Sequence, residues 1–196
     1  MKELTYYTII GKNLELFKWH FNNIKLSGLY DLDIPVEFLV IIYKNNNISE
    51  ETTKSIVDFC ENNHISYYIY EEEYPDFISN LYKCWNLGYE KAKYEWVFRA
   101  GSDQAFNTGA FKALYDASVA VPDKTVIQAN TVECRARIEQ IGAISRHYTV
   151  NLGDSYSNFD QQSFENFVSE INSKTNLNIL DISESLNAWQ RPTQLG

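Results

Sequence analysis

Positive charge is scarce in this sequence. The 196 residues carry 17 Lys and Arg against 26 Asp and Glu, which gives a formal net charge of −9. General binding to nucleic acid or to anionic membranes depends on clustered Lys and Arg, so the composition argues against both. An anionic ligand would therefore need a local cationic group or a metal ion.

Cysteines and long apolar runs are also few. Cys60, Cys84 and Cys134 are odd in number and lack metal-ligand spacing, so we expect reduced thiols in a cytoplasmic protein. No apolar run approaches the ~20 residues that a membrane span requires. The N-terminus MKELTYYTII lacks a signal-peptide pattern. We expect a soluble protein that is not exported.

Motifs of several common enzyme classes are missing. There is no GxxxxGK(S/T) loop and no GxGxxG fingerprint, so no standard phosphate-binding loop is present. GxSxG, HExxH and paired CxxC motifs are absent too, which argues against serine hydrolases, zinc proteases and zinc ribbons.

Segments typical of strands alternate with segments typical of helices over residues 1–130. The predicted strands are Leu4 to Ile10, Val36 to Tyr43, Ile65 to Tyr70, Glu95 to Ala100 and Thr125 to Ala129. Helices are predicted between them, with N-caps at Asn13, at Ser49, at Ser79 and at Asn107 or Thr108. This alternation predicts one α/β domain with a Rossmann-like, mostly parallel central sheet and helices on both faces.

The predicted helix that begins at Ser79 has apolar or small residues at helical spacing. These residues are Leu81, Cys84, Trp85, Gly88, Tyr89 and Ala92. We expect the side chains of Trp85 and Tyr89 in the core.

The strand after this helix ends at Gly101, Ser102 and Asp103. Ligands of open α/β sheets bind at the carboxyl ends of strands, so Asp103 is expected at a ligand or metal site. The alternative is that Asp103 only caps the turn and helix that follow.

Residues 131–196 give weaker patterns. Residues 132–138 alternate like a half-exposed strand, residues 151–159 are typical of a loop, and residues 177–182 favour a short strand. A helix is predicted around Phe164, Phe167, Val168 and Ile171. The ending LNAWQRPTQLG predicts no element that would bury its tryptophan, so we expect the chain to be cut from something longer.

Three segments together resemble the nucleotide-sugar-binding half of GT-A-fold glycosyltransferases of the family-2 type: YTIIGKN, VEFLVIIYKNNN and NLYKCWNLGYEKAKYEWVFRAGSDQAF. In that family a first strand and turn end in an Asn, and a second strand has polar residues at its tip. An Asn-to-Gly helix then leads into a strand that ends in a DxD metal motif. The resemblance covers residues 4–130. It implies a GT-A fold, with residues 1–130 binding the donor and residues 131–196 as an acceptor-side extension of the same domain.

The resemblance also implies an activity. It implies transfer of a sugar from a UDP- or GDP-sugar to a glycan or other hydroxyl acceptor, assisted by Mn²⁺ or Mg²⁺. The donor-site residues that it implies are Thr8, Ile10, Asn13, Lys44, Asn45, Asn80, Lys83, Gly101, Ser102 and Asp103. Asp103 matches the last acid of DxD, which binds the metal in the family.

Two positions depart from the family pattern. Gly101 stands in place of the first acid of DxD, and Lys44 with Asn45 stands where an acid commonly contacts the base or ribose. Lys44 could instead pair with a phosphate or hydrogen-bond a base; alternatively it is a solvated loop lysine. Asn80 could simply serve the start of its helix.

An inverting transferase needs a carboxylate that deprotonates the acceptor hydroxyl. The candidates are Glu133, Glu139, Asp154, Asp160 and Asp181, and we expect Glu133 and Asp154 to be catalytic residues beside Asp103. Each also fits a surface salt bridge or a turn. His147 is a candidate metal ligand, and Arg135, Arg137 and Arg146 could offset diphosphate charge.

Two other functions remain open. The incomplete DxD motif and the lack of an obvious base fit a non-catalytic binding domain of the same fold. A sugar nucleotidyltransferase is disfavoured, because the glycine-rich basic loop such enzymes use after the first strand is reduced here to GKN.

Overall fold

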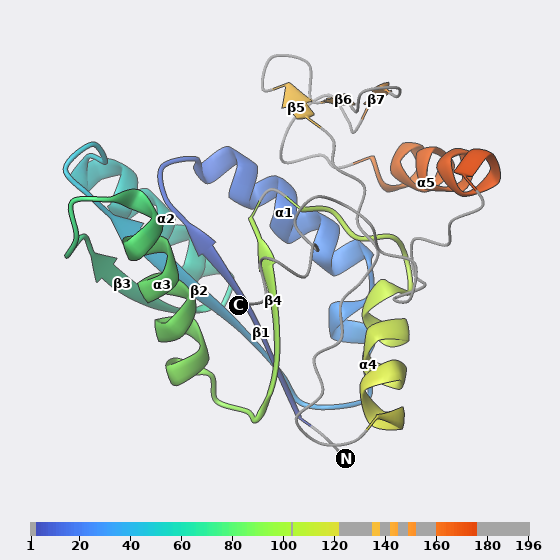
Figure 1. The fold of residues 1–196 in the computed structure, drawn as a ribbon, viewed down its shortest axis with the longest axis horizontal. Helices are drawn as coiled ribbons and strands as arrows, with labels where there is room; N and C mark the ends of the chain where they lie inside the picture. Colours follow the sequence, from blue (N-terminus) through green and yellow to red (C-terminus); the bar gives the residue numbers. More distant parts are fainter. Residues whose placement is uncertain are drawn as a thin grey trace. The chain divides into compact units, whose positions relative to one another are not determined.

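The computed structural model describes residues 3–102, 104–121, 135–137, 142–144, 149–151 and 160–175. Its elements are β1 (Leu4–Ile10), α1 (Leu14–Leu26), the 3-10 turn η1 (Leu29–Asp31), β2 (Val36–Lys44), α2 (Glu50–Asn62), β3 (Ser66–Glu71), α3 (Phe77–Lys91), β4 (Trp96–Gly101), α4 (Ala110–Ala120), β5 (Arg135–Arg137), β6 (Gly142–Ile144), β7 (Thr149–Asn151) and α5 (Gln161–Thr175) (Figure 1).

The chain divides into two compact units. The first comprises residues 1–20 and 30–104, and the second comprises residues 21–29 and 105–196. The predicted boundary between residues 130 and 131 lies outside the described residues and stays a prediction.

Within the described residues, the first unit is built on a four-stranded, all-parallel sheet with the order β3-β2-β1-β4. Its central strand β2 is an almost continuous run of β-branched and aromatic residues, and residues 38–43 are buried. Such runs are typical of strands that are covered on both faces. The predicted α/β fold with a parallel, Rossmann-like sheet is confirmed. The predicted fifth strand, residues 125–129, lies outside the described residues.

Helices cover both faces of this sheet. On one face Tyr6 packs against Phe38, and Phe17 of α1 contacts both Phe38 and Phe59 of α2. On the other face α3 contributes Cys84 to a buried cluster. The strand residues of this cluster are Tyr7, Leu39, Ile41, Tyr43 and Tyr70. The two sets separate because successive side chains of a strand point to opposite faces.

Helix α3 packs unusually close to the sheet. A Cβ atom at Gly88 would lie 2.3 Å from the ring of Tyr7, so only glycine fits there without a shift of its neighbours. This approach sets the buried stripe of α3 at Asn80, Cys84 and Gly88. Tyr89, predicted in the core, is instead 68% exposed, because it lies outside that stripe.

Two of the four predicted helix caps are confirmed. The Asn13 side chain accepts a hydrogen bond from the Leu16 N–H at 3.0 Å, and Ser49 accepts one from the Thr52 N–H at 3.1 Å. Each satisfies an N–H of the first turn that has no partner within the helix.

The other two predicted caps are wrong. Helix α3 begins earlier than predicted, because Asp76 adopts an extended backbone and its carboxylate accepts from the Ser79 N–H at 2.8 Å. The N-cap residue of helix α4 is Gly109, which has a φ of 78° and makes no side-chain hydrogen bond. A left-handed glycine thus replaces the polar cap expected at Asn107 or Thr108.

The second unit contains α4, α5 and the antiparallel strands β5, β6 and β7 in that order. Helix α5 and strand β5 confirm elements predicted around residues 164–171 and 132–138. Asp160 precedes α5 and accepts from the Ser163 N–H at 2.9 Å and the Ser163 hydroxyl at 2.7 Å. Of the loop predicted at 151–159, Asn151 is instead the last residue of β7, and residues 152–159 lie outside the described residues, as does the predicted strand at 177–182.

Candidate functional site

The strand order places a switch point between β1 and β4. From β1 the chain proceeds to β2 and β3 on one side and then returns to β4 on the other side of β1. The register pairs Ile9 with Gly101, so the carboxyl ends of β1 and β4 lie next to each other. Ligands of open α/β sheets bind at such a switch point. The residues that follow are Gly11, Lys12 and Asn13 after β1, and Ser102 and Asp103 after β4.

Three residues predicted at the end of β1 have structural roles. Thr8 is 0% exposed and donates its hydroxyl hydrogen to the Ala100 carbonyl at 2.8 Å, which ties β1 to β4. Ile10 is 2% exposed, and Asn13 caps α1. The side chains of Thr8 and Ile10 are buried and offer no surface to a ligand. In this structure they belong to the core beneath the strand end.

Lys12 is the residue at this strand end that the resemblance did not select. It is exposed, and it forms no ion pair within the described part of the chain. The sequence feature that could have indicated Lys12 is the GKN tripeptide directly after the first strand. An ammonium group there supplies the local cation that an acidic protein needs to hold an anion.

The turn after β4 is held at both ends. The Gln104 N–H donates to the Gly101 carbonyl at 3.2 Å, and the Gly101 N–H donates to the Gln104 side-chain oxygen at 2.8 Å. The Gln104 carbonyl also accepts from Nδ1 of His20, at 2.6 Å. Asp103, between these residues in the chain, lies outside the described residues.

His20 of α1 joins this turn to β1. Its Nε2 atom lies 2.7 Å from the Tyr6 hydroxyl. A carbonyl can only accept, so Nδ1 of the neutral imidazole carries the hydrogen and Nε2 accepts from Tyr6. Burial lowers the pKa of His20 to about 4, although its bond to the Gln104 carbonyl acts in the opposite direction. The ring is therefore neutral at pH 7.

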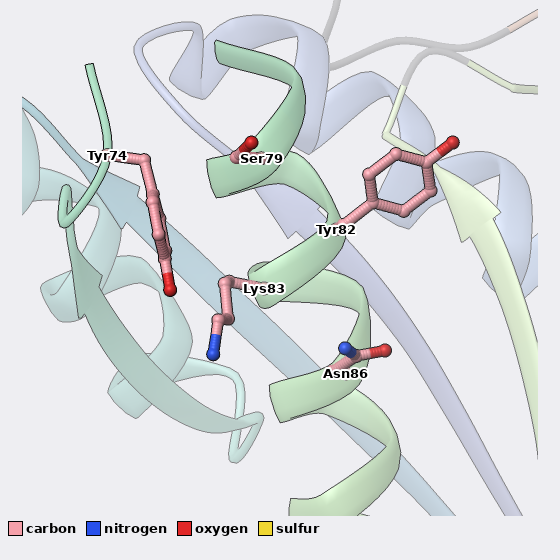
Figure 2. A pocket seen from close by; sticks show the side chains of 5 residues that line it. All are labelled: Tyr74, Ser79, Tyr82, Lys83 and Asn86. Carbon is pink, nitrogen blue, oxygen red and sulfur yellow. The ribbon is translucent and has the colours of Figure 1, made fainter. Parts of the chain in front are cut away.

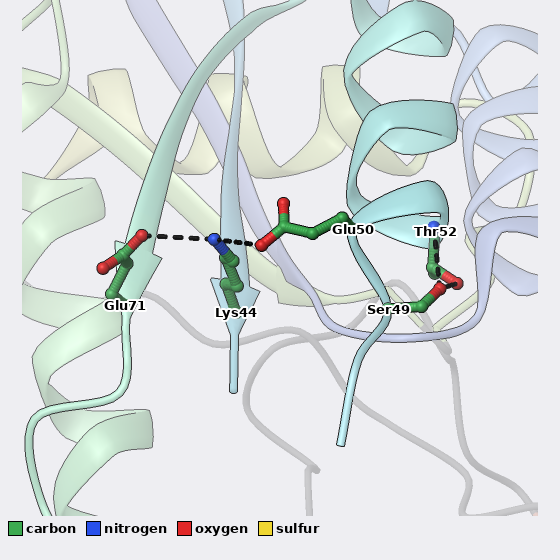
Figure 3. A network of polar contacts seen from close by, with 5 residues as sticks. All are labelled: Lys44, Ser49, Glu50, Thr52 and Glu71. Atoms are coloured by element: carbon green, nitrogen blue, oxygen red, sulfur yellow. Dashed lines mark hydrogen bonds and ion pairs between the residues drawn. The ribbon is translucent and has the colours of Figure 1, made fainter. Parts of the chain in front are cut away.

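Lys44, a predicted donor residue, is already paired. Its ammonium lies 2.8 Å from the Glu50 carboxylate and 3.3 Å from that of Glu71 (Figure 3). The hydrogen bonds to Glu50 and Glu71 raise the pKa of Lys44. A phosphate would have to displace these carboxylates, so the phosphate-binding role for Lys44 has no support in this structure.

Lys44 and Asn45 line a pocket of about 370 Å³ together with Glu50, Glu71 and Glu72. Three carboxylates face one ammonium group there, so the pocket is negatively charged. The Asn45 side chain accepts from the Asn47 N–H at 2.9 Å, which stabilises the turn after β2. This pocket does not suit a diphosphate.

Asn80 and Lys83, the two predicted donor residues on α3, lie in different environments. Asn80 is 0% exposed. Its amide oxygen accepts from the Tyr70 hydroxyl and from the N–H groups of Glu73 and Tyr74, and its amide nitrogen donates to the carbonyls of Tyr74 and Asp76. The side chain thus organises the 71–76 loop and has no atom left for a ligand.

Lys83 lies on the exposed part of α3. Its ammonium is 5.8 Å from the centre of the Tyr74 ring, and Figure 2 shows the two side chains beside each other. They line a pocket of about 290 Å³ with Ser79, Tyr82 and Asn86. The structure therefore does not place Lys83 with Asn80 in one donor site.

Most residues predicted to act in catalysis, to bind the metal or to offset diphosphate charge lie outside the described residues, so their roles stay predictions. These are Asp103, Glu133, Glu139, Arg146, His147, Asp154 and Asp181. Asp160 is described and serves as the cap of α5. Among the residues that the structure describes, no group of three or more His, Cys, Asp or Glu could hold a metal ion.

None of the helices described is long and apolar enough to cross a membrane.

Comparison with known proteins gives matches only among solved structures, since no family model and no curated protein matches this chain. The mannosyltransferase PcManGT from Pyrobaculum calidifontis, in complex with GDP-Man and Mn²⁺, is 19% identical with a TM-score of 0.44, over 70% of this chain and 36% of that chain. S. aureus TarS 1-349 is 18% identical with a TM-score of 0.38, over 60% of this chain and 31% of that chain. A second S. aureus TarS structure is 18% identical with a TM-score of 0.40, over 67% of this chain and 24% of that chain.

This chain therefore spans between 24% and 36% of the length of these three structures. One of them is by name a glycosyltransferase, the class that the sequence resemblance implies. At such identities and TM-scores we draw no conclusion about activity from the likeness.

Proposed function

We propose that this chain is the donor-binding part of a metal-assisted glycosyltransferase. It moves a sugar from a nucleotide diphosphate to a saccharide or other hydroxyl acceptor. The observation that carries the proposal is the switch point, where the carboxyl ends of β1 and β4 are neighbours and continue into GKN and GSD. A cation, a hydroxyl and a carboxylate are thus supplied by two chain segments that begin side by side.

The proposed roles follow from the chemistry of these side chains. Lys12, exposed and without an ion pair among the described residues, neutralises part of the diphosphate charge. Asp103 holds the metal, and Ser102 beside it offers a hydroxyl to the diphosphate. Glu133 and Asp154 remain the candidates for the base, and His147 the candidate second metal ligand.

The donor set suits Mg²⁺ or Mn²⁺ only in part. With Gly101 in place of an acid, the segment after β4 offers one carboxylate, and hard cations complete such a site with phosphate oxygens and water. When bound, the metal would stabilise the charge of the departing diphosphate. We therefore expect the protein to bind metal weakly alone and well together with the nucleotide.

The experiment is a thermal-shift titration with UDP, GDP and their sugars, with and without Mn²⁺. The wild type is compared with Asp103→Asn and with a control, Asp58→Asn, which alters an exposed carboxylate on α2. We expect a rise in Tm of about 5–10 °C at about 100 times the dissociation constant, requiring both Mn²⁺ and Asp103. The control variant should behave like the wild type.

Two outcomes count against the proposal. If no nucleotide or nucleotide sugar stabilises the wild type, donor binding is refuted. If a donor binds but neither transfer nor donor hydrolysis releases nucleotide diphosphate, the chain is a binding domain rather than an enzyme.

A further inference from the structure

Helix α1 and the residue after it carry a stripe of buried polar side chains. His20, Asn23 and Ser27 are each 0% exposed, and they follow one another at spacings of three and four residues. Such a stripe is normally apolar in a helix that packs against a sheet. Burying a polar side chain costs free energy unless it finds hydrogen-bond partners.

All three side chains bind main-chain groups of the short segment after β4. His20 Nδ1 donates to the Gln104 carbonyl at 2.6 Å. Asn23 donates to the Phe106 carbonyl at 2.9 Å and accepts from the Phe106 N–H at 2.6 Å. The Ser27 hydroxyl donates to the same Phe106 carbonyl at 2.6 Å. The stripe therefore binds a backbone segment rather than filling the core with apolar volume.

We propose that His20 is a positioning residue for the donor site, holding the Gly101–Gln104 turn through the Gln104 carbonyl. This inference rests on the proposed function, which assigns Ser102 to the diphosphate and Asp103 to the metal. His20 does not touch a ligand. It acts by fixing the backbone at Gln104, which is hydrogen-bonded to Gly101, and that fixation leaves less of the chain to be ordered when a donor binds.

The geometry also explains why histidine is used. The ring must donate from Nδ1 to Gln104 and accept at Nε2 from Tyr6, and the neutral Nδ1–H tautomer does both. Tyr6 packs against Phe38 and Phe98 of the sheet, so its hydroxyl is a fixed reference point. The hydrogen bond to the Gln104 carbonyl holds the turn, and the bond from Tyr6 gives the other ring nitrogen a partner.

A pair of matched variants separates the two bonds. In His20→Asn the amide nitrogen lies near the position of Nδ1, so the bond to Gln104 is kept and that to Tyr6 is lost. In His20→Gln the amide reaches the position of Nε2, so the bond to Tyr6 is kept and that to Gln104 is lost. Tyr6→Phe removes only the hydroxyl and controls for damage to the core.

The first readout is amide hydrogen exchange of peptides that cover residues 101–106, without any ligand. We expect exchange about tenfold faster in His20→Gln, the equivalent of one lost hydrogen bond, and near-wild-type exchange in His20→Asn and Tyr6→Phe. The second readout is donor affinity with Mn²⁺, which should fall by about tenfold in His20→Gln alone. Equal effects in His20→Asn and His20→Gln would show a merely structural role and overturn the inference.

A measurement on the wild type needs no variant to fold. Nitrogen-15 NMR of the His20 ring should show the hydrogen on Nδ1 at pH 7, and a hydrogen on Nε2 instead would refute the proposed bond direction. Exchange and NMR test the positioning without a donor, whereas wild-type donor binding tests the proposed function. A protein that binds no nucleotide sugar but shows the expected exchange pattern would overturn the donor-site role and leave His20 as the residue that holds the turn.

Discussion

The buried imidazole of His20 makes the stability of this protein depend on pH in a defined window. Burial lowers its pKa from the ordinary 6.5 to about 4 in the folded state. The unfolded chain therefore takes up a proton at higher pH than the folded chain. The stabilisation is complete above pH 6.5 and is lost as the pH falls toward 4.

The size of the effect follows from the shift. One pKa unit corresponds to about 1.4 kcal/mol, so the whole shift is worth about 3 kcal/mol, of which about 2 kcal/mol is lost between pH 7.5 and pH 5. The ordinary pKa values of Asp and Glu lie below about pH 4.5, so carboxylates contribute little in this interval.

Urea unfolding at half-unit steps from pH 7.5 to pH 5 measures this loss. His20→Asn has no ring to titrate. Between pH 7.5 and pH 5 its free energy of unfolding should therefore fall by about 2 kcal/mol less than that of the wild type. His64→Asn is the control, because His64 is exposed and should leave the wild-type slope unchanged. Parallel curves for the wild type and His20→Asn would refute the buried, neutral imidazole.

Three further predictions concern other contacts. Gly88→Ala should lower the free energy of unfolding by roughly 1–3 kcal/mol despite the better helix propensity of alanine, because its Cβ would lie 2.3 Å from the Tyr7 ring; equal or higher stability in urea unfolding would contradict this. Asn80→Ala should cost roughly 2–4 kcal/mol and open the 71–76 loop to proteolysis, since buried main-chain groups lose their partner; an uncleaved loop would show that other contacts hold it. Lys12→Gln should weaken donor binding by about tenfold in a binding titration, whereas Lys44→Gln, its matched control, should change it by less than about twofold; the reverse order would assign the phosphate to Lys44.

Much of the fold could be predicted because its signals are local. The strand from Val36 to Tyr43 is predicted by a run of adjacent apolar residues. The caps Asn13 and Ser49 are also local, because each bonds an N–H only three residues further along the chain. The position of α3 on the sheet is not local. It depends on the contact between Gly88 and Tyr7, and so the exposure of Tyr89 could not be predicted from helical spacing alone.

The candidate site was harder to predict for the same reason. Lys44 is neutralised by Glu50 from α2 and Glu71 from β3, two residues that only the fold brings to it. His20 lies beside an apolar stripe, so periodicity gave no reason to select it. Its partners, Tyr6 and the Gln104 carbonyl, lie 14 and 84 residues away along the chain.

The way Asn80 holds the 71–76 loop affects how freely that loop can change in sequence. Four of its five hydrogen bonds go to the backbone, at Glu73, Tyr74 and Asp76, and none to a loop side chain. Backbone groups are the same whatever residue supplies them, so the loop keeps its shape while Glu72, Glu73 and Tyr74 vary. With Asn80 retained, random substitution at these three positions would yield a library of folded proteins that differ in the surface beside the carboxyl end of β3.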